Sequence, residues 1–100
     1  LLDRMRSFSA SASSHLLEGK RLEQGGELPS ALRAYDRALA ADPAMAQAQV
    51  NRIGVLARMG NFEQAEVAFR AAIAMDGSLP EAYYNYGLAL LSARRLAEAE

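Results

Sequence analysis

The residues best suited to chemistry stand near the N-terminus, where Ser13 and Ser14 precede His15, the only histidine of the chain. A serine beside a histidine can supply a nucleophile and its general base. Adjacent residues on a helix point in different directions, however, and the sequence offers no evident third residue to orient the histidine. One histidine without any cysteine does not form a zinc site. We therefore interpret His15 as a packing or solvent-edge residue and expect neither catalytic residues nor a metal site.

Two other polar features lack the context that chemistry would need. Glu18, Glu23 and Glu27 recur at helical spacing, and such rows usually form a solvated helix face. Gly25 and Gly26 are adjacent, but the strand and phosphate-binding loop that would give them a role are missing from their surroundings. The sequence therefore predicts no cofactor and no enzyme activity.

The composition is that of an ordinary globular domain. The 100 residues are 51% hydrophobic and 23% charged, with a net charge of −1 and no cysteine. The interspersed charges form no basic patch for nucleic acid and no polybasic run for an anionic membrane. No apolar run approaches the roughly 20 residues that span a bilayer, and the opening "LLDRMRSFSA" is too charged and too short for a secretory signal. We expect a soluble single domain, and the lack of cysteine is compatible with cytoplasm or periplasm.

The chain repeats itself at an offset of 34 residues. "AYDRALAADP" at residues 34–43 returns as "AFRAAIAMDG" at residues 68–77. Alanine, the best helix former, is the commonest residue, and hairpin signals are missing, so both copies are expected to be helical. A fixed period of this length is typical of stacked helical units. The aligned positions are Leu22, Leu56 and Leu90; Ala31, Ala65 and Ala99; Tyr35 and Phe69; Ala38 and Ala72; Asp42 and Asp76; and Asn51 and Asn85.

Each unit is expected to contain two helices. Glycines at 25–26 and at 60 suit helix ends, and Pro29 and Pro80 suit helix starts. The expected helices cover residues 13–24, 29–41, 47–59, 63–75 and 81–92, with a further helix beginning near Leu96. The expected organisation is a lead-in segment or short helix at 1–11, with "SFSASASS" flexible, complete units at 12–45 and 46–79, and a partial third unit at 80–100.

These features resemble the tetratricopeptide repeat family, and bacterial-type arrays in particular. The resemblance depends on the 34-residue period, on small residues such as Gly19 and Gly87, on the aligned alanines and aromatics, and on the terminator Asp42-Pro43. It implies an all-α fold, an α-solenoid of stacked antiparallel helix pairs in which Tyr35 fills the gap between pairs, as does Phe69. Because the third unit is partial, we expect a longer solenoid or another chain to cover its exposed apolar residues, with self-association as a weaker hypothesis. These residues are Tyr83, Tyr86 and Leu90.

The resemblance also implies a concave groove lined by the first helix of each unit. Asparagine offers a donor and an acceptor, so Asn51 and Asn85 would either grip a peptide backbone or bond within the solenoid. Chaperone-binding members hold a C-terminal carboxylate with basic residues, whereas Glu81 and Leu16 occupy two of the matching places here. We expect free-acid peptides to bind no better than amidated ones. The groove positions are Leu16, Lys20, Gln47, Val50, Asn51, Arg58, Glu81, Tyr84, Asn85 and Leu88, with Ser13 and Glu23 beside them.

Two functions remain open from the sequence. The first is a non-catalytic scaffold that binds a peptide or helical segment of a partner protein in the groove. The second is the substrate-recognition arm of a larger enzyme, similar to a glycosyltransferase, sulfotransferase or hydroxylase, whose catalytic domain lies outside this chain. The first is favoured because no residue of the chain is suited to catalysis, and the expected partner is a protein or peptide rather than nucleic acid.

Overall fold

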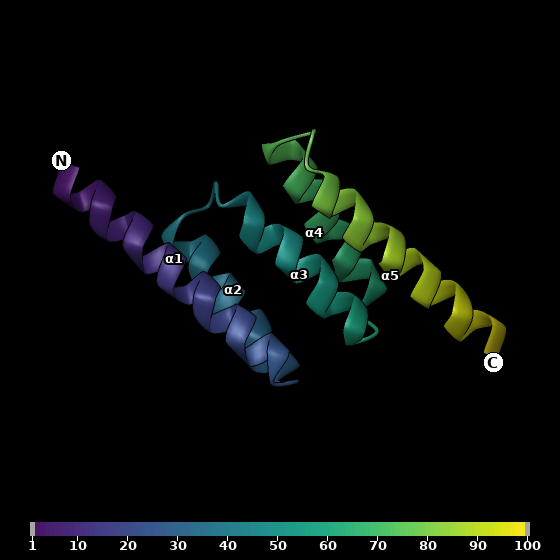
Figure 1. The fold of residues 1–100 in the computed structure, drawn as a ribbon. Coiled ribbons are helices and arrows are strands. Elements are labelled where there is room, and N and C mark those ends of the chain that lie inside the picture. The colour runs from purple at the N-terminus through teal and green to yellow at the C-terminus, as the bar shows by residue number, and fades with distance from the viewer. Residues whose placement is uncertain (1, 100) are drawn as a thin grey trace.

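The computed structural model describes the backbone of residues 2–99 and the side chains of residues 11–99. Within that range the chain forms five α-helices and no strand. They pack as antiparallel pairs into an elongated solenoid with extents of 54 × 29 × 17 Å, in which α1, α3 and α5 run side by side in the same direction (Figure 1). The all-α solenoid predicted from the repeat is confirmed. The helices are α1 (Leu2–Gln24), α2 (Leu28–Ala41), α3 (Ala46–Arg58), α4 (Phe62–Met75) and α5 (Pro80–Ala99).

The turns inside the first two units depend on left-handed glycines. Gly26 and Gly60 both have a φ of 79°, a conformation that a side chain disfavours. In each turn the following N–H reaches back over the helix end, from Glu27 to the Leu22 carbonyl at 2.9 Å and likewise in the second unit at 2.8 Å. These bonds satisfy carbonyls that a helix end would otherwise leave unpaired.

The third unit lacks this turn. Arg94 stands where the other units have glycine, and α5 continues through it to Ala99. The prediction of a separate helix beginning near Leu96 is therefore wrong. Arginine, alanine and leucine are all good helix formers, and no residue here favours the left-handed conformation that ends a helix.

The N-terminal helix is also longer than predicted. α1 runs without interruption from Leu2 to Gln24, so the prediction that "SFSASASS" is flexible is wrong. The serines suggested a loop, but alternating alanine gives this stretch enough helix propensity to extend the helix that packs on α2. Ala12, within the serine-rich stretch, is fully buried, so packing fixes this part of the helix as well.

Small residues bring the helices of each pair together. Ala31 and Ala65 are fully buried, and a Cβ added to Gly19 would collide with the ring of Tyr35. Tyr35 is itself fully buried and clusters with Val55 of the next unit. It therefore fills the gap between successive helix pairs, as predicted.

Aromatic stacking performs the same role at the next boundary. Phe69 of α4 stacks on Tyr86 of α5 with ring centroids 4.2 Å apart, and meets Tyr83 edge-on at 5.4 Å. The prediction that Tyr86 lacks cover is wrong, because Phe69 covers it. Tyr83 and Leu90 are 50% and 54% exposed, as expected of a face without a neighbouring helix.

Candidate functional site

Three adjoining cavities lie along α1, α3 and α5, and together they form what we call the groove. The α1–α3 cavity has a volume of about 230 Å³, the central cavity about 380 Å³ and the α3–α5 cavity about 280 Å³. Asn51 of α3 borders all of them, so the cavities meet at its side chain. The first helix of each unit contributes most of the lining, because its outer face is left free by the second helices.

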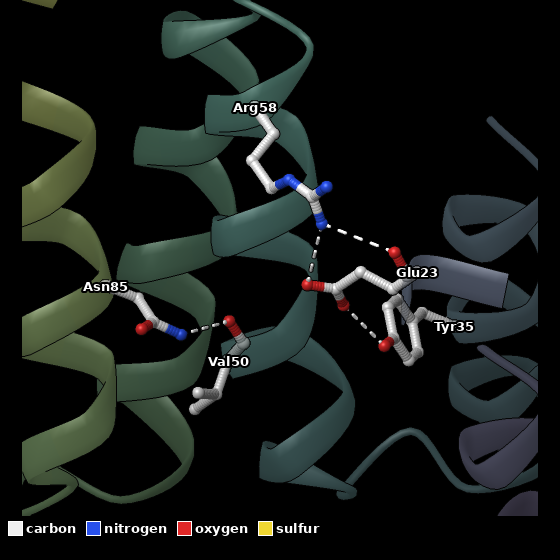
Figure 2. A network of polar contacts seen from close by, with 5 residues as sticks. All are labelled: Glu23, Tyr35, Val50, Arg58 and Asn85. Carbon is white, nitrogen blue, oxygen red and sulfur yellow. Dashed lines mark hydrogen bonds and ion pairs between the residues drawn. The ribbon is translucent and has the colours of Figure 1, made fainter. Parts of the chain in front are cut away.

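A polar network fixes the end of the groove nearest α1 (Figure 2). Tyr35 donates its hydroxyl hydrogen to Glu23 Oε1 at 2.7 Å. Arg58 places Nη1 at 3.6 Å from Glu23 Oε2 and donates to the Glu23 main-chain oxygen at 3.4 Å. Glu23 is thus held from two helices, and Arg58 ties the end of α3 to the end of α1.

The buried tyrosine of this network stays protonated. Burial raises the pKa of Tyr35 far above its ordinary value of 10.0, and the hydrogen bond and negative charge of Glu23 raise it further. The Asn51 side chain opposes this with a smaller lowering effect. Tyr35 therefore acts as a permanent neutral donor that orients Glu23 at the floor of the groove.

The two asparagines of the groove make different contacts. Asn85 donates from Nδ2 to the Val50 carbonyl at 3.1 Å and so joins α5 to α3 (Figure 2). Asn51 instead accepts at Oδ1 from Gln47 Nε2 of its own helix, at 3.0 Å. The prediction left open whether these side chains bond within the solenoid or face a ligand. Asn85 bonds within it, and Asn51 lies where the cavities meet.

Most of the predicted groove residues border these cavities. Two depart from their predicted places. Leu16 borders none of the cavities described above and packs instead on the cluster of Ala31, Tyr35 and Val55. Val50 borders the α3–α5 cavity, yet its side chain is only 1% exposed and belongs to the core. The predicted residues on the cavity walls are Lys20, Glu23, Gln47, Asn51, Arg58, Glu81, Tyr84, Asn85 and Leu88.

The sequence interpretation missed several lining residues. Gly54 and Ser92 border the central cavity, and Pro80 borders the α3–α5 cavity. Helical spacing could have found two of them, since Gly54 follows Asn51 by three positions and Ser92 follows Leu88 by four. Short side chains such as those of glycine and serine carry little signal of binding in a sequence.

The remaining candidates for chemistry lie outside the groove. Ser13 and Ser14 are exposed on α1, and the half-buried His15 does not border the cavities. Across the described residues, no group of three or more acidic, histidine or cysteine side chains is placed to hold a metal ion. In the same part of the chain, no helix is both long and apolar enough to cross a bilayer.

Comparison with protein families identifies the class of protein. The tetratricopeptide repeat model matches residues 16–66 and 55–100, which together include most of the chain. The chain therefore belongs to the tetratricopeptide repeat family. Among curated proteins, none matches this sequence significantly.

Solved structures of the same fold include complexes with peptides. The second tetratricopeptide domain of Spaghetti (RPAP3), bound to the HSP90 peptide SRMEEVD, is 28% identical over 99% of this chain and 90% of that one, with a TM-score of 0.83. The first such domain of Spaghetti, bound to the same peptide, is 27% identical over 91% of this chain and 74% of that one, with a TM-score of 0.81. The TPR2B domain of yeast Sti1, described as a complex with pHsp70, is 28% identical over 91% of this chain and 73% of that one, also with a TM-score of 0.81.

Proposed function

We propose that this chain is a non-catalytic scaffold that binds a peptide or helical segment of a partner protein in the groove. The observation that carries the proposal is the meeting of three cavities at one partly buried asparagine, Asn51. A side-chain amide can donate to and accept from a peptide backbone whatever the peptide sequence. The peptide complexes of the similar domains support the same use of this fold.

The exposed side chains of α5 add an apolar contact surface beside this amide. Tyr84 is 68% exposed and Leu88 is 45% exposed, and both border the groove. Tyrosine is a frequent anchor in protein interfaces because it buries a large area with few rotatable bonds. A peptide lying along the groove would thus meet polar groups at Asn51 and apolar area on α5.

The proposed partner differs in charge from the HSP90 peptide held by the similar domains. Gripping a terminal carboxylate requires positive charge, whereas Glu81 brings negative charge to the α5 side of the groove. Lys20 and Arg58 lie at the other end, and Arg58 is already in contact with Glu23. We infer that the partner is recognised through an internal segment rather than through a terminal carboxylate.

Selection from a phage-displayed library of random heptapeptides tests the proposal. Enriched peptides should bind the wild type and lose at least 10-fold in affinity on Asn51→Ala/Tyr84→Ala, measured by fluorescence anisotropy. The matched control is Gln64→Ala/Val67→Ala, which alters two exposed residues of α4 outside the groove. Failure to enrich any peptide, or equal losses in both double variants, would refute the proposed function.

A further inference from the structure

The α3–α5 cavity has the chemistry of a cation site. Glu81 is the one charged side chain on its wall, and Tyr84, three residues later on α5, offers a largely exposed ring. The α3 wall of the cavity carries the amides of Gln47 and Asn51, and Asn85 lies on α5 with Glu81 and Tyr84. A carboxylate and an aromatic face are the two groups that favour a bound ammonium or guanidinium.

The carboxylate of Glu81 is available for a ligand. Among the described residues it takes part in no ion pair, whereas Glu23, at the other end of the groove, is held by Arg58. Asn85 uses Nδ2 to bond the Val50 carbonyl, which leaves its Oδ1 as a second acceptor on the cavity wall. Glu81, the Asn85 Oδ1 and the Gln47 Oε1 are therefore open acceptors on this wall, while Asn51, whose Oδ1 accepts from Gln47, offers its Nδ2 as a donor. The Glu81 carboxylate is the group that favours a cation here.

We propose that the α3–α5 cavity receives a cationic side chain, arginine or lysine, from the bound peptide. The inference rests on the proposed function, since it names the residue type that this part of the groove selects. The α3–α5 cavity has a volume of about 280 Å³ and is wide open to solvent, so a long side chain can enter it from outside. The guanidinium or ammonium lies against the Tyr84 ring and within reach of the Glu81 carboxylate.

The same arrangement gives the groove a direction. Lys20, Arg58 and Glu23 border the α1–α3 cavity, where Arg58 pairs with Glu23 and Lys20 joins no ion pair among the described residues, while Glu81 borders the α3–α5 cavity. A peptide that places its basic residue beside Glu81 brings an acidic residue elsewhere in its sequence near Lys20. The same peptide bound in the opposite orientation would place its basic residue near Lys20 and its acidic residue near Glu81, so like charges would meet at both ends. Like-charge contacts discriminate against the wrong orientation.

The probes are the peptides enriched by the heptapeptide selection. Each is synthesised in two forms, one with its basic residue and one with citrulline, the neutral isostere of arginine, at that position. We expect the citrulline replacement to weaken binding to wild type about 5- to 20-fold. On Glu81→Gln the same replacement should cost less than 3-fold, because the charge partner is gone. Glu63→Gln is the matched control, since Glu63 is the second residue of α4 as Glu81 is of α5, and it does not border the groove.

A second variant distinguishes the contribution of the Tyr84 ring from that of the Glu81 carboxylate. Tyr84→Leu keeps apolar area but removes the aromatic face, so it should weaken the basic peptide about 3-fold more than the citrulline peptide. Tyr83→Leu, on the neighbouring face of α5, is the control and should weaken the affinity of the basic peptide and of the citrulline peptide by the same factor. Enriched peptides without a basic residue, or an equal citrulline effect on wild type and Glu81→Gln, would overturn the cation site and leave the scaffold function standing. A selection that enriches no peptide would overturn both.

Discussion

Replacing Gly19 and Gly87 by alanine, one at a time, should change stability in opposite directions. The two glycines occupy the same place in their units, 68 residues apart, and both lie inside helices. A Cβ on Gly19 would strike the Tyr35 ring, whereas a Cβ on Gly87 meets nothing within 4 Å. The same substitution therefore tests packing at one site and bare helix propensity at the other.

The expected magnitudes follow from three effects. Overfilling a packed core costs about 1–3 kcal/mol. Moving the Tyr35 ring also breaks the 2.7 Å hydrogen bond to Glu23, and a hydrogen bond to a charged acceptor contributes about 1.5–3 kcal/mol. Alanine in place of glycine in a helix returns about 1 kcal/mol. Gly19→Ala should thus lose about 3 kcal/mol of unfolding free energy, and Gly87→Ala should gain about 1 kcal/mol.

Urea unfolding followed by circular dichroism at 222 nm measures both free energies, with the denaturant slope compared between variants. Equal slopes are expected, because neither substitution changes the area that unfolding exposes. A Gly19→Ala variant as stable as Gly87→Ala would refute the reasoning, since it would mean that Tyr35 can move away from α1 at no cost. If Gly19→Ala does not fold, the gain in Gly87→Ala still tests the propensity half of the argument.

Three further predictions concern the network, the asparagines and the choice of ligand. Tyr35→Phe should cost about 1–2 kcal/mol of unfolding free energy at pH 7. Because the pKa of Tyr35 is raised in the folded state, its contribution to stability is complete below pH 10.0 and is lost progressively as the pH rises above that value, where the unfolded chain ionises first. Urea unfolding from pH 8 to 11 should therefore show the stability of the wild type approaching that of the variant. Asn85→Ala should lose about 1 kcal/mol because the hydrogen bond that joins α5 to the Val50 carbonyl of α3 is lost, whereas Asn51→Ala should leave stability nearly unchanged and weaken peptide binding. Equal losses of stability would contradict this division. Peptides that end in an acidic residue should bind equally as free acids and as amides in anisotropy titrations, and a clear preference for the free acid would refute the charge argument.

The repeat period allowed the fold to be predicted because it depends on residue size. Buried alanines such as Ala31 and Ala65 and the aromatics Tyr35 and Phe69 keep their size class at an offset of 34 residues, and size decides how helices pack. The ends of α1 and α5 were mispredicted for a different reason. They depend on whether neighbouring turns form, and at position 94 arginine replaces the glycine of the other units while packing positions on either side, such as Leu90 and Ala99, keep their size class.

The groove was predicted less completely because its walls depend on contacts between helices. Periodicity placed Lys20, Arg58 and Tyr84 on helix faces that border the cavities. It placed Leu16 on the groove side as well, but helix α1 turns that side chain toward the core cluster around Tyr35. Successive residues lie about 100° apart around a helix axis, so only a few residues define each face, and a residue at the edge of the groove face, such as Leu16, can belong to the core instead.

The two boundaries between units are built differently, and paired substitutions explain the difference. Tyr35, which packs at the first boundary, donates to Glu23 of its own unit. One period later the same two places hold Phe69 and Ala57, so the donor and the acceptor are lost together. Because a buried hydroxyl without a partner is costly, losing only the acceptor would have left the second boundary strained.

The second boundary replaces this bond with other contacts. Phe69 stacks on Tyr86, and Asn85 bonds the Val50 carbonyl across the helices (Figure 2). The charged anchor of Glu23 and Arg58 therefore belongs to the α1 end alone, and the α5 end is held by neutral contacts. On the α5 side of the groove the charge is that of Glu81, which stands in the first turn of α5, where the helix N-terminus favours a carboxylate, and which joins no ion pair among the described residues.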